Sequence, residues 1–298
     1  MFALAPSRQT GLIIVTVTFL FAPAMDILAK LLTSYHSPGQ IVLGRFLVQS
    51  ALLVPLVMAT RQWGRPRLGH LLAGASLAAA LLCLNAALTV MPVANAIAIF
   101  FVEPLILTVL SAVFLSETIG WRRISAVIVG LIGAMIVIRP NWAAFGPTAA
   151  LPLGTALFFA IYVMINRVMT MGGRRLVLQF WTGLASALVI GVACLWGETA
   201  GIGTLALSAP GLEAAWLFLA MGVFAVITHQ MILVSLSMIP ASLLAPMQYI
   251  EIVSAVLLGW WVFADFPDAL TWAGTAIIIA SGVYVFHRER KVQEEETP

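Results

Sequence analysis

Five charged side chains in this sequence stand inside long apolar runs, where little water can solvate an ionisable group. Asp26, Lys30 and Arg45 fall in the first two runs, while Glu103 and Glu251 each lie about ten residues into a later run. A charge inside a bilayer is costly unless it is paired or hydrated, so such residues mark ion pairs, substrate sites or proton relays. These five residues are therefore the first candidates for a functional role.

The composition indicates a membrane protein. Apolar residues make up 62% of the 298 residues and charged residues only 9%, whereas a soluble domain carries about 25% charge. The net charge of +3 comes from cations that flank the apolar runs, so it does not predict a nucleic-acid partner. Cys83 and Cys194 have no neighbouring metal ligands, and no common catalytic motif is present, so we expect no metal, no cofactor and no enzymatic activity.

Ten apolar runs are long enough to span a bilayer, which takes roughly 20 residues of helix. The connections between them are short, so no soluble domain is inserted. The pattern predicts an all-α polytopic membrane protein with ten transmembrane helices. The runs lie near 11–32, 39–60, 68–90, 93–115, 122–139, 148–168, 176–196, 212–237, 241–263 and 269–287.

The distribution of Lys and Arg predicts the orientation, because cytoplasmic loops are enriched in these residues. With the N-terminus inside, eleven of the fifteen cations fall on the cytoplasmic side. We therefore expect a cell inner-membrane protein with both termini in the cytoplasm. The polar segment 289–298 is expected to be a disordered cytoplasmic tail. The eleven cations are Arg8, Arg61, Arg65, Arg67, Arg122, Arg123, Arg174, Arg175, Arg288, Arg290 and Lys291.

A short pattern occurs twice, 148 positions apart. Each half of the chain holds five predicted spans, and an odd number places the two halves in opposite orientations. We therefore predict an inverted repeat, with one unit over 1–140 and the other over 141–288. Inverted repeats allow a protein to exchange outward-open and inward-open shapes, so a transporter of a small-molecule substrate is expected. The copies are Ala87-Leu88, Pro92, Glu103 and Glu117, then Ser235-Leu236, Pro240, Glu251 and Asp265.

The region from Asn85 to Pro140 resembles the EamA repeat of the drug/metabolite transporter superfamily. The resemblance implies ten helices in two inverted five-helix EamA repeats, and movement of small metabolites, often outward. Amino-acid exporters, including the aromatic amino-acid exporter, belong to this superfamily. The matching residues are Ala87-Leu88, Pro92, Asn95-Ala96, Glu103-Pro104, Glu117, Gly130 and Gly133, then Pro240-Ala241, Glu251, Gly274 and Gly282, with Tyr162, Asn166 and Arg167 opening the second copy.

A narrower resemblance lies in Asp26, Lys30, Pro38, Gln40 and Arg45. This set is similar to a sub-group that includes S-adenosylmethionine and riboflavin uptake proteins. It keeps import as the alternative to export.

Asp26 and Lys30 are four residues apart, which places them on one face of the first helix. One interpretation is a self-neutralising ion pair that holds this helix in the bundle. Another is that the pair faces the cavity and meets a zwitterionic substrate. Arg45 either joins Asp26 in a structural network, which we favour, or grips a substrate carboxylate with its planar guanidinium.

Glu103 and Glu251 both reach the middle of the membrane, because their helices enter from opposite faces. Hydrogen bonding between helices, proton coupling and direct contact with a substrate ammonium are the open roles. Pro104 removes a backbone donor and is expected to bend its helix at this depth. Together with nearby polar side chains, the predicted substrate-binding set is Glu251, Gln248, Tyr249, His229, Asn85 and Glu103.

The function expected from the sequence is export of amino acids or similar small metabolites by alternating access. The alternative is an importer of a nutrient such as riboflavin or S-adenosylmethionine. A membrane enzyme would need a nucleophile with a base, or a metal cluster, which the sequence does not offer. A scaffold protein is the remaining alternative, and it predicts no solute-dependent stabilisation. The expected partners are the substrate and the lipid bilayer, and the expected state is a monomer or weak homodimer.

Overall fold

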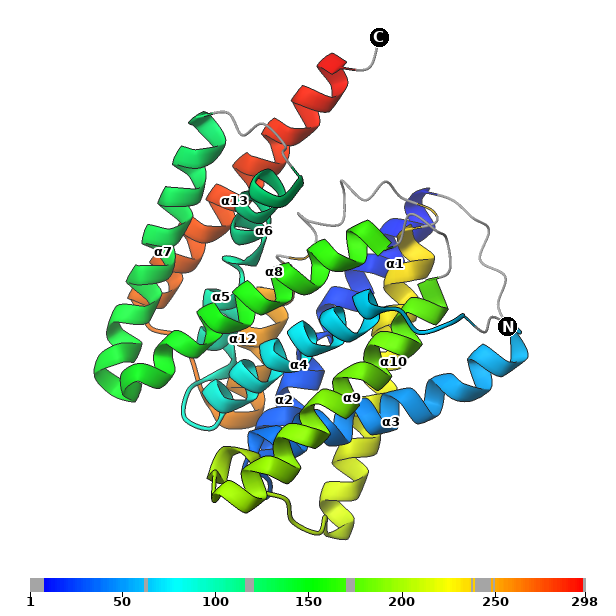
Figure 1. The fold of residues 1–298 in the computed structure, drawn as a ribbon. Helices are drawn as coiled ribbons and strands as arrows, with labels where there is room; N and C mark the ends of the chain where they lie inside the picture. The colour runs from blue at the N-terminus through cyan, green and yellow to red at the C-terminus, as the bar shows by residue number, and fades with distance from the viewer. Residues whose placement is uncertain are drawn as a thin grey trace.

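The computed structural model of the chain is a bundle of helices, with no β-strand in the part of the chain that it describes (Figure 1). It describes residues 8–61, 64–115, 121–169, 175–236, 238, 248 and 250–296. The first half of the chain forms α1 (Arg8–Phe21), α2 (Pro23–Leu32), α3 (Pro38–Ala59), α4 (Leu68–Leu88), α5 (Val93–Phe100), α6 (Glu103–Leu115) and α7 (Trp121–Phe145). The second half forms η1 (Gly146–Ala150), α8 (Leu151–Met169), α9 (Arg175–Ala200), η3 (Gly203–Leu205), α10 (Leu212–Leu236), α12 (Ile250–Phe263) and α13 (Ala269–Glu296).

The helices confirm the predicted class of an all-α polytopic membrane protein. Seven helical segments are long and apolar enough to cross a membrane by length and composition. Three shorter apolar helices cover 124–138, 250–263 and 269–284. Each of these ten segments overlaps one of the ten runs expected from the sequence.

Two of the predicted spans are interrupted, and each interruption lies beside a proline. Pro23 follows the end of α1, and Pro104 lies at the second residue of α6, after the break at 101–102. A proline has no N–H to donate to the carbonyl four residues earlier, so it bends or breaks a helix. At Pro23 the carbonyl left without this donor belongs to Phe19, and it accepts a hydrogen bond from Ser254 Oγ of α12 at 3.1 Å. The break in the first span is therefore also a point of contact with the second half of the chain.

The C-terminal segment differs from the sequence expectation. The tail 289–298 was expected to be disordered, but α13 continues as a helix to Glu296. Arg, Lys, Gln and Glu are good helix formers, and a helix that is already nucleated in the membrane extends at little cost.

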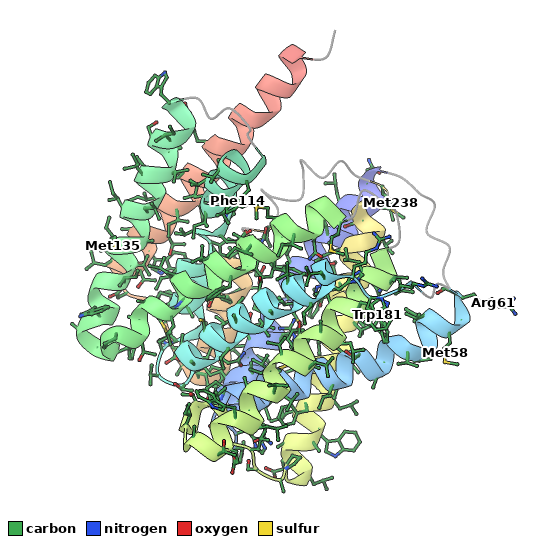
Figure 2. The ribbon with its side chains drawn as sticks, in the orientation of Figure 1. Met58, Arg61, Phe114, Met135, Trp181 and Met238 are labelled. Carbon is green, nitrogen blue, oxygen red and sulfur yellow. The ribbon has the colours of Figure 1, made fainter. Side chains whose placement is uncertain are left out.

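The outer surface of the bundle is apolar, as a lipid-facing surface must be. Figure 2 shows Met58 and Met135 at the periphery, and these side chains are 58% and 62% exposed. Phe114 of α6 is 65% exposed. In water such a surface would drive aggregation, whereas lipid tails cover it at no cost.

The helices of the two halves pack against each other in reciprocal pairs. In one direction, α4 of the first half packs on α8 and α9. In the other, α10 of the second half packs on α1, α2 and α3. The pairs α3–α9, α6–α8 and α7–α13 also cross the interface, and Figure 1 shows α7 beside α13.

Two glycines at the repeat spacing lie at equivalent helix crossings. Gly74 of α4 and Gly222 of α10 are 148 positions apart, the same offset as Glu103 and Glu251. A Cβ on Gly74 would lie 2.7 Å from Ala185 Cβ and 2.8 Å from the Ser186 backbone nitrogen, both on α9. A Cβ on Gly222 would overlap Val48 Cγ1 on α3. At both crossings the helices approach closely because glycine leaves the space.

Hydrogen bonds join the two halves of the chain near the start of α3 and just after its end. Gln40, near the start of α3, accepts from the backbone N–H of Ser208 at 2.9 Å. His36 Nδ1 lies 2.8 Å from Ser208 Oγ. At the other end, Trp181 Nε1 of α9 donates to the Gly64 carbonyl at 2.8 Å, and Figure 2 labels Trp181 there.

Candidate functional site

The cation expected to pair with Asp26 has a different partner. Lys30 Nζ lies 2.7 Å from Asp265 Oδ2, in the connection between α12 and α13, and 4.5 Å from the centre of the Phe263 ring. The predicted Asp26–Lys30 ion pair is therefore wrong. The two residues do share a helix, α2, but spacing along one helix cannot reveal a partner 235 positions away.

Asp26 interacts with Arg45 instead. The Arg45 guanidinium of α3 is within electrostatic range of Asp26, and also of Tyr162 on α8 and His229 on α10. Asp26 is in turn within electrostatic range of Glu251 on α12. We call Asp26, Arg45, His229 and Glu251 the Arg45 cluster. Its members come from both halves of the chain.

Local structure explains how Glu251 reaches this position. Glu251 is the second residue of α12, and Ser254 lies one turn after it. The Ser254 hydroxyl, which bonds to the Phe19 carbonyl, fixes this turn of α12 against the end of α1. Ile250 packs against Val15 and Phe19 of α1. Because α2 continues from Pro23, Asp26 follows within one turn of this contact.

The Arg45 cluster is only partly closed. Asp26, Arg45, His229 and Glu251 all retain part of their accessible surface, although protein surrounds and desolvates each of them. Arg45 Nε makes no hydrogen bond to any described residue. Ionisable residues inside membrane-spanning helices commonly mark substrate or ion pathways.

Glu103 has a different environment. Only 4% of its surface is exposed, and its Oε1 has no hydrogen-bond partner among the described residues. Among the described residues, Glu103 is surrounded by protein without a charged neighbour, in contrast to Glu251, which lies within electrostatic range of Asp26. Glu103 therefore lies outside the Arg45 cluster, beside Pro104 at the break between α5 and α6.

The other polar residues of the predicted substrate-binding set also differ in their surroundings. Asn85 is buried, at 5% exposure, and its Nδ2 donates to the Leu81 carbonyl at 2.8 Å within its own helix. Gln230, next to the predicted His229, donates to Gln179 of α9 at 3.0 Å, so it links two helices of one half. Gln248 is helical and half-buried. Tyr249 lies outside the described residues.

An aromatic group adjoins the Arg45 cluster. Phe100 of α5 and Phe159 of α8 meet edge to face, with ring centres 5.4 Å apart. Phe159 also contacts Tyr162, at 5.4 Å between centres, and a hydrogen bond joins Tyr162 to Asn166. The sequence offered Tyr162 and Asn166 only as family markers, and it gave no sign that they border Arg45.

A hollow at the surface of the bundle lies away from the predicted site residues. A hollow of about 360 Å³ between α7 and α13 is lined by apolar residues with Ser125, Ser281 and Tyr284, and it contains none of the candidates. Within the described ranges, no three His, Cys, Asp or Glu side chains gather as metal ligands would.

Comparisons with known proteins agree with this architecture. Residues 9–139 match the EamA-like transporter family. The chain is 27% identical over 278 residues to an S-adenosylmethionine uptake transporter of Rickettsia felis, which covers 92% of this chain and 91% of that protein. It is 28% identical over 207 residues to a riboflavin transporter of Vibrio cholerae, covering 69% of this chain and 66% of that protein.

An exporter is also among the similar proteins. The chain is 26% identical over 276 residues to a pseudopaline exporter of Pseudomonas aeruginosa, covering 91% of this chain and 93% of that protein. A solved crystal structure matches with a TM-score of 0.65 at 16% identity, over 96% of this chain and 99% of that chain, which shows a shared fold. The chain therefore carries, over residues 9–139, a domain of the EamA-like transporter family in the drug/metabolite transporter superfamily, and it is similar over nine-tenths of its length to membrane transporters.

Proposed function

We propose that this protein moves a small organic metabolite across the cell inner membrane by alternating access, with uptake as its direction. The observation that carries the proposal is the Arg45 cluster, which joins Asp26 and Arg45 of the first half to His229 and Glu251 of the second. A solute bound to residues of both halves responds to any movement of one half against the other.

The reciprocal packing supports the division into two inverted five-helix repeats, 1–140 and 141–288. The contacts of α4 with α8 and α9 have counterparts in those of α10 with α1, α2 and α3. The glycines at 74 and 222 support the same division. In Figure 1 the start of α1 and the ends of α3 and α13 lie along the upper and right edges of the bundle. Each of these helix ends adjoins a cation-rich segment of the sequence. This placement supports cytoplasmic termini.

Uptake is favoured over the amino-acid export that the sequence suggested. The relatives that are named as uptake transporters align over nine-tenths of this chain, across both halves. Their alignment spans Asp26, Arg45 and Glu251, which form the site proposed here. Export remains the second candidate because the pseudopaline exporter aligns over a similar length.

Reconstitution in liposomes tests the proposal. The purified protein should accumulate or exchange at least one radiolabelled solute from a panel of S-adenosylmethionine, riboflavin and amino acids. Arg45→Met should abolish this movement, whereas Arg65→Met, a change of equal charge in a connection between helices, should leave it intact. Movement of solute that is unaffected by Arg45→Met would place the site elsewhere. Preparing the protein in both orientations and loading each side in turn separates uptake from export.

A further inference from the structure

The hollow between α7 and α13 begins where these two helices cross closely. A Cβ on Gly274 of α13 would lie 2.6 Å from the carbonyl oxygen of Gly133 on α7, so glycine at this crossing lets the two backbones meet. From the crossing the helices diverge toward the end of the bundle at which α7 begins and α13 ends (Figure 1). A space of about 360 Å³ opens between them.

The residues that line the hollow occupy one face of each helix. They are Ser125, Ala126 and Val129 on α7, and Ile277, Ala280, Ser281 and Tyr284 on α13. Val129 and Tyr284 are 47% and 46% exposed, so the hollow opens to the outer surface of the bundle, where lipid tails surround the protein. The lining is apolar apart from hydroxyl groups, and the Ser281 hydroxyl already donates to the Ile277 carbonyl at 2.8 Å. Such a lining suits an acyl chain.

Cations follow the hollow on the same two helix faces. Residues three, four or seven positions apart share a face of a helix. On α7, Arg122 is three positions before Ser125 and seven before Val129. On α13, Arg288 is four positions after Tyr284. In the sequence segments 121–125 and 284–291, the remaining charged residues are Arg123, Glu289, Arg290 and Lys291. Cations therefore outnumber acids at the open end of the hollow.

The depth of these cations in the membrane is indicated by Trp121. This residue begins α7, directly before Arg122, and its side chain is 73% exposed. Exposed tryptophans concentrate at the level of the lipid headgroups. The cations then lie at the level of the lipid phosphates, and the hollow lies at the level of the acyl chains. Basic pockets between transmembrane helices are known binding sites for anionic lipid headgroups.

A second copy of the chain would fit this face poorly. In a symmetric dimer with its axis along the membrane normal, the same residues of both copies meet at the same depth. The cations of α7 and α13 would then face those of the partner, and like charges repel. An anionic lipid neutralises these charges instead.

We propose that the hollow between α7 and α13 binds an anionic phospholipid, with one acyl chain in the hollow and the phosphate beside Arg122 and Arg288. The orientation proposed above places this lipid in the cytoplasmic leaflet. The proposal does not depend on which solute the protein carries. Because α7 belongs to the first half of the chain and α13 to the second, a lipid bound to both stabilises the contact between the halves.

Two lipids with the same acyl chains test the role of the headgroup. Delipidated protein in detergent is titrated with dioleoyl phosphatidylglycerol, which is anionic, or with dioleoyl phosphatidylcholine, which has no net charge. Native mass spectrometry measures the bound lipid, and thermal unfolding measures the stabilisation. Glycerol 3-phosphate supplies the anionic group without acyl chains. We expect phosphatidylglycerol to bind about tenfold more tightly than phosphatidylcholine, and glycerol 3-phosphate to give no stabilisation.

Charge variants connect this preference to the ends of α7 and α13. Arg122→Gln combined with Arg288→Gln should reduce the preference for phosphatidylglycerol to less than about threefold. Arg61→Gln combined with Arg65→Gln is the matched control, since it removes two cations from the connection between α3 and α4. The control should keep the preference of the parent protein.

A variant that fills the hollow tests the role of the acyl chain. Ala280→Phe places a large side chain in the hollow and should weaken the binding of phosphatidylglycerol about tenfold. Val283→Phe, at a position of α13 that is 41% exposed and does not line the hollow, should leave the binding unchanged. Thermal unfolding without lipid identifies any variant that fails to fold. The charge variants still decide the proposal if Ala280→Phe is among them.

Several outcomes would overturn the proposal. Equal affinity for the two lipids, or a preference that the Arg122 and Arg288 changes leave intact, would reject the headgroup site. Stabilisation by glycerol 3-phosphate equal to that by phosphatidylglycerol would indicate a site for a free anion. A dimer of the protein that Ala280→Phe dissociates would show that a second copy covers the hollow.

Discussion

Glu103 and Glu251 occupy equivalent positions in the two halves of the chain, 148 residues apart, and yet their surroundings differ. Glu251 retains accessible surface and lies near Asp26, within reach of Arg45's network. Glu103 is 4% exposed, and no charged neighbour lies near it in the part of the chain that the structure describes. A duplicated sequence pattern therefore preserved the position of an acid but not its environment.

Gly74 and Gly222, in contrast, have matching surroundings in the two halves. Gly74 and Gly222 have the same offset as the two acids, and both allow a helix of one half to approach a helix of the other. Packing of the scaffold is thus matched between the halves, whereas the charged residues around Glu251 have no counterpart around Glu103 among the described residues. An asymmetric substrate can contact only one arrangement of charges at a time, which is consistent with a single site.

The largest expected effect comes from breaking the Arg45 cluster. Arg45→Met removes the guanidinium that lies within electrostatic range of Asp26, and an acid without a compensating charge inside the bundle is destabilising. We expect a loss of about 1–3 kcal/mol, the usual range for a disruptive single substitution. Thermal unfolding in detergent, compared with Arg65→Met, provides the measurement.

A second variant distinguishes a network from separate roles. Asp26→Asn combined with Arg45→Met removes both partners, so it should be more stable than Arg45→Met alone. Simple addition of the two single losses would show that Asp26 and Arg45 do not act together.

The next effect tests the matched part of the comparison. Gly74→Ala should destabilise the protein by about 1–3 kcal/mol, because the new methyl group meets the α9 backbone at Ser186 as well as Ala185. Gly222→Ala meets mainly the Val48 side chain and should cost less, since a side chain can shift more easily than a helix. Thermal unfolding of both variants checks the order, and an equal or reversed order would mean that the crossings relax in the same way.

Much of the fold could be predicted from the sequence, because apolar length is a local property. The ten runs, and the interruptions at Pro23 and Pro104, follow from hydropathy and from a missing N–H donor. The helical extension to Glu296 was not predicted, because the polar segment 289–298 was expected to be disordered and not to continue the preceding helix.

The site was harder to predict, because its contacts join residues far apart in sequence. Asp26, Arg45, Glu251 and His229 were recognised as candidates from their charge or polarity in apolar runs. Their partners were not, since Lys30 pairs with Asp265 across 235 positions and Tyr162 borders Arg45 from another helix. Spacing along one helix favoured an ion pair between Asp26 and Lys30, but in the folded chain Lys30 pairs with Asp265.

A direct comparison of the two acids should show a difference in transport. Glu251→Gln should lower transport of the preferred solute about tenfold, equivalent to one lost interaction of about 1.4 kcal/mol. Glu103→Gln should have a smaller effect, because no charged partner is lost and the amide fits the same volume. Initial rates in liposomes, normalised to the amount of folded protein, compare the variants. Equal losses for both would indicate that the two acids serve the site together.

The smallest expected effect concerns the Lys30–Asp265 ion pair. Its side chains are 17% and 31% exposed, so solvent screens the charges and a double-mutant cycle should give a coupling of about 1 kcal/mol or less. Lys30→Met and Asp265→Asn provide the cycle, with thermal unfolding as the measurement. The coupling should shrink in 1 M salt, where the Debye length is about 3 Å. The matched control is the cycle of Lys30→Met with Asp26→Asn, whose effects should add because Arg45, not Lys30, neutralises Asp26. A larger coupling in that control than in the Lys30–Asp265 cycle would restore the pairing that the sequence alone suggested.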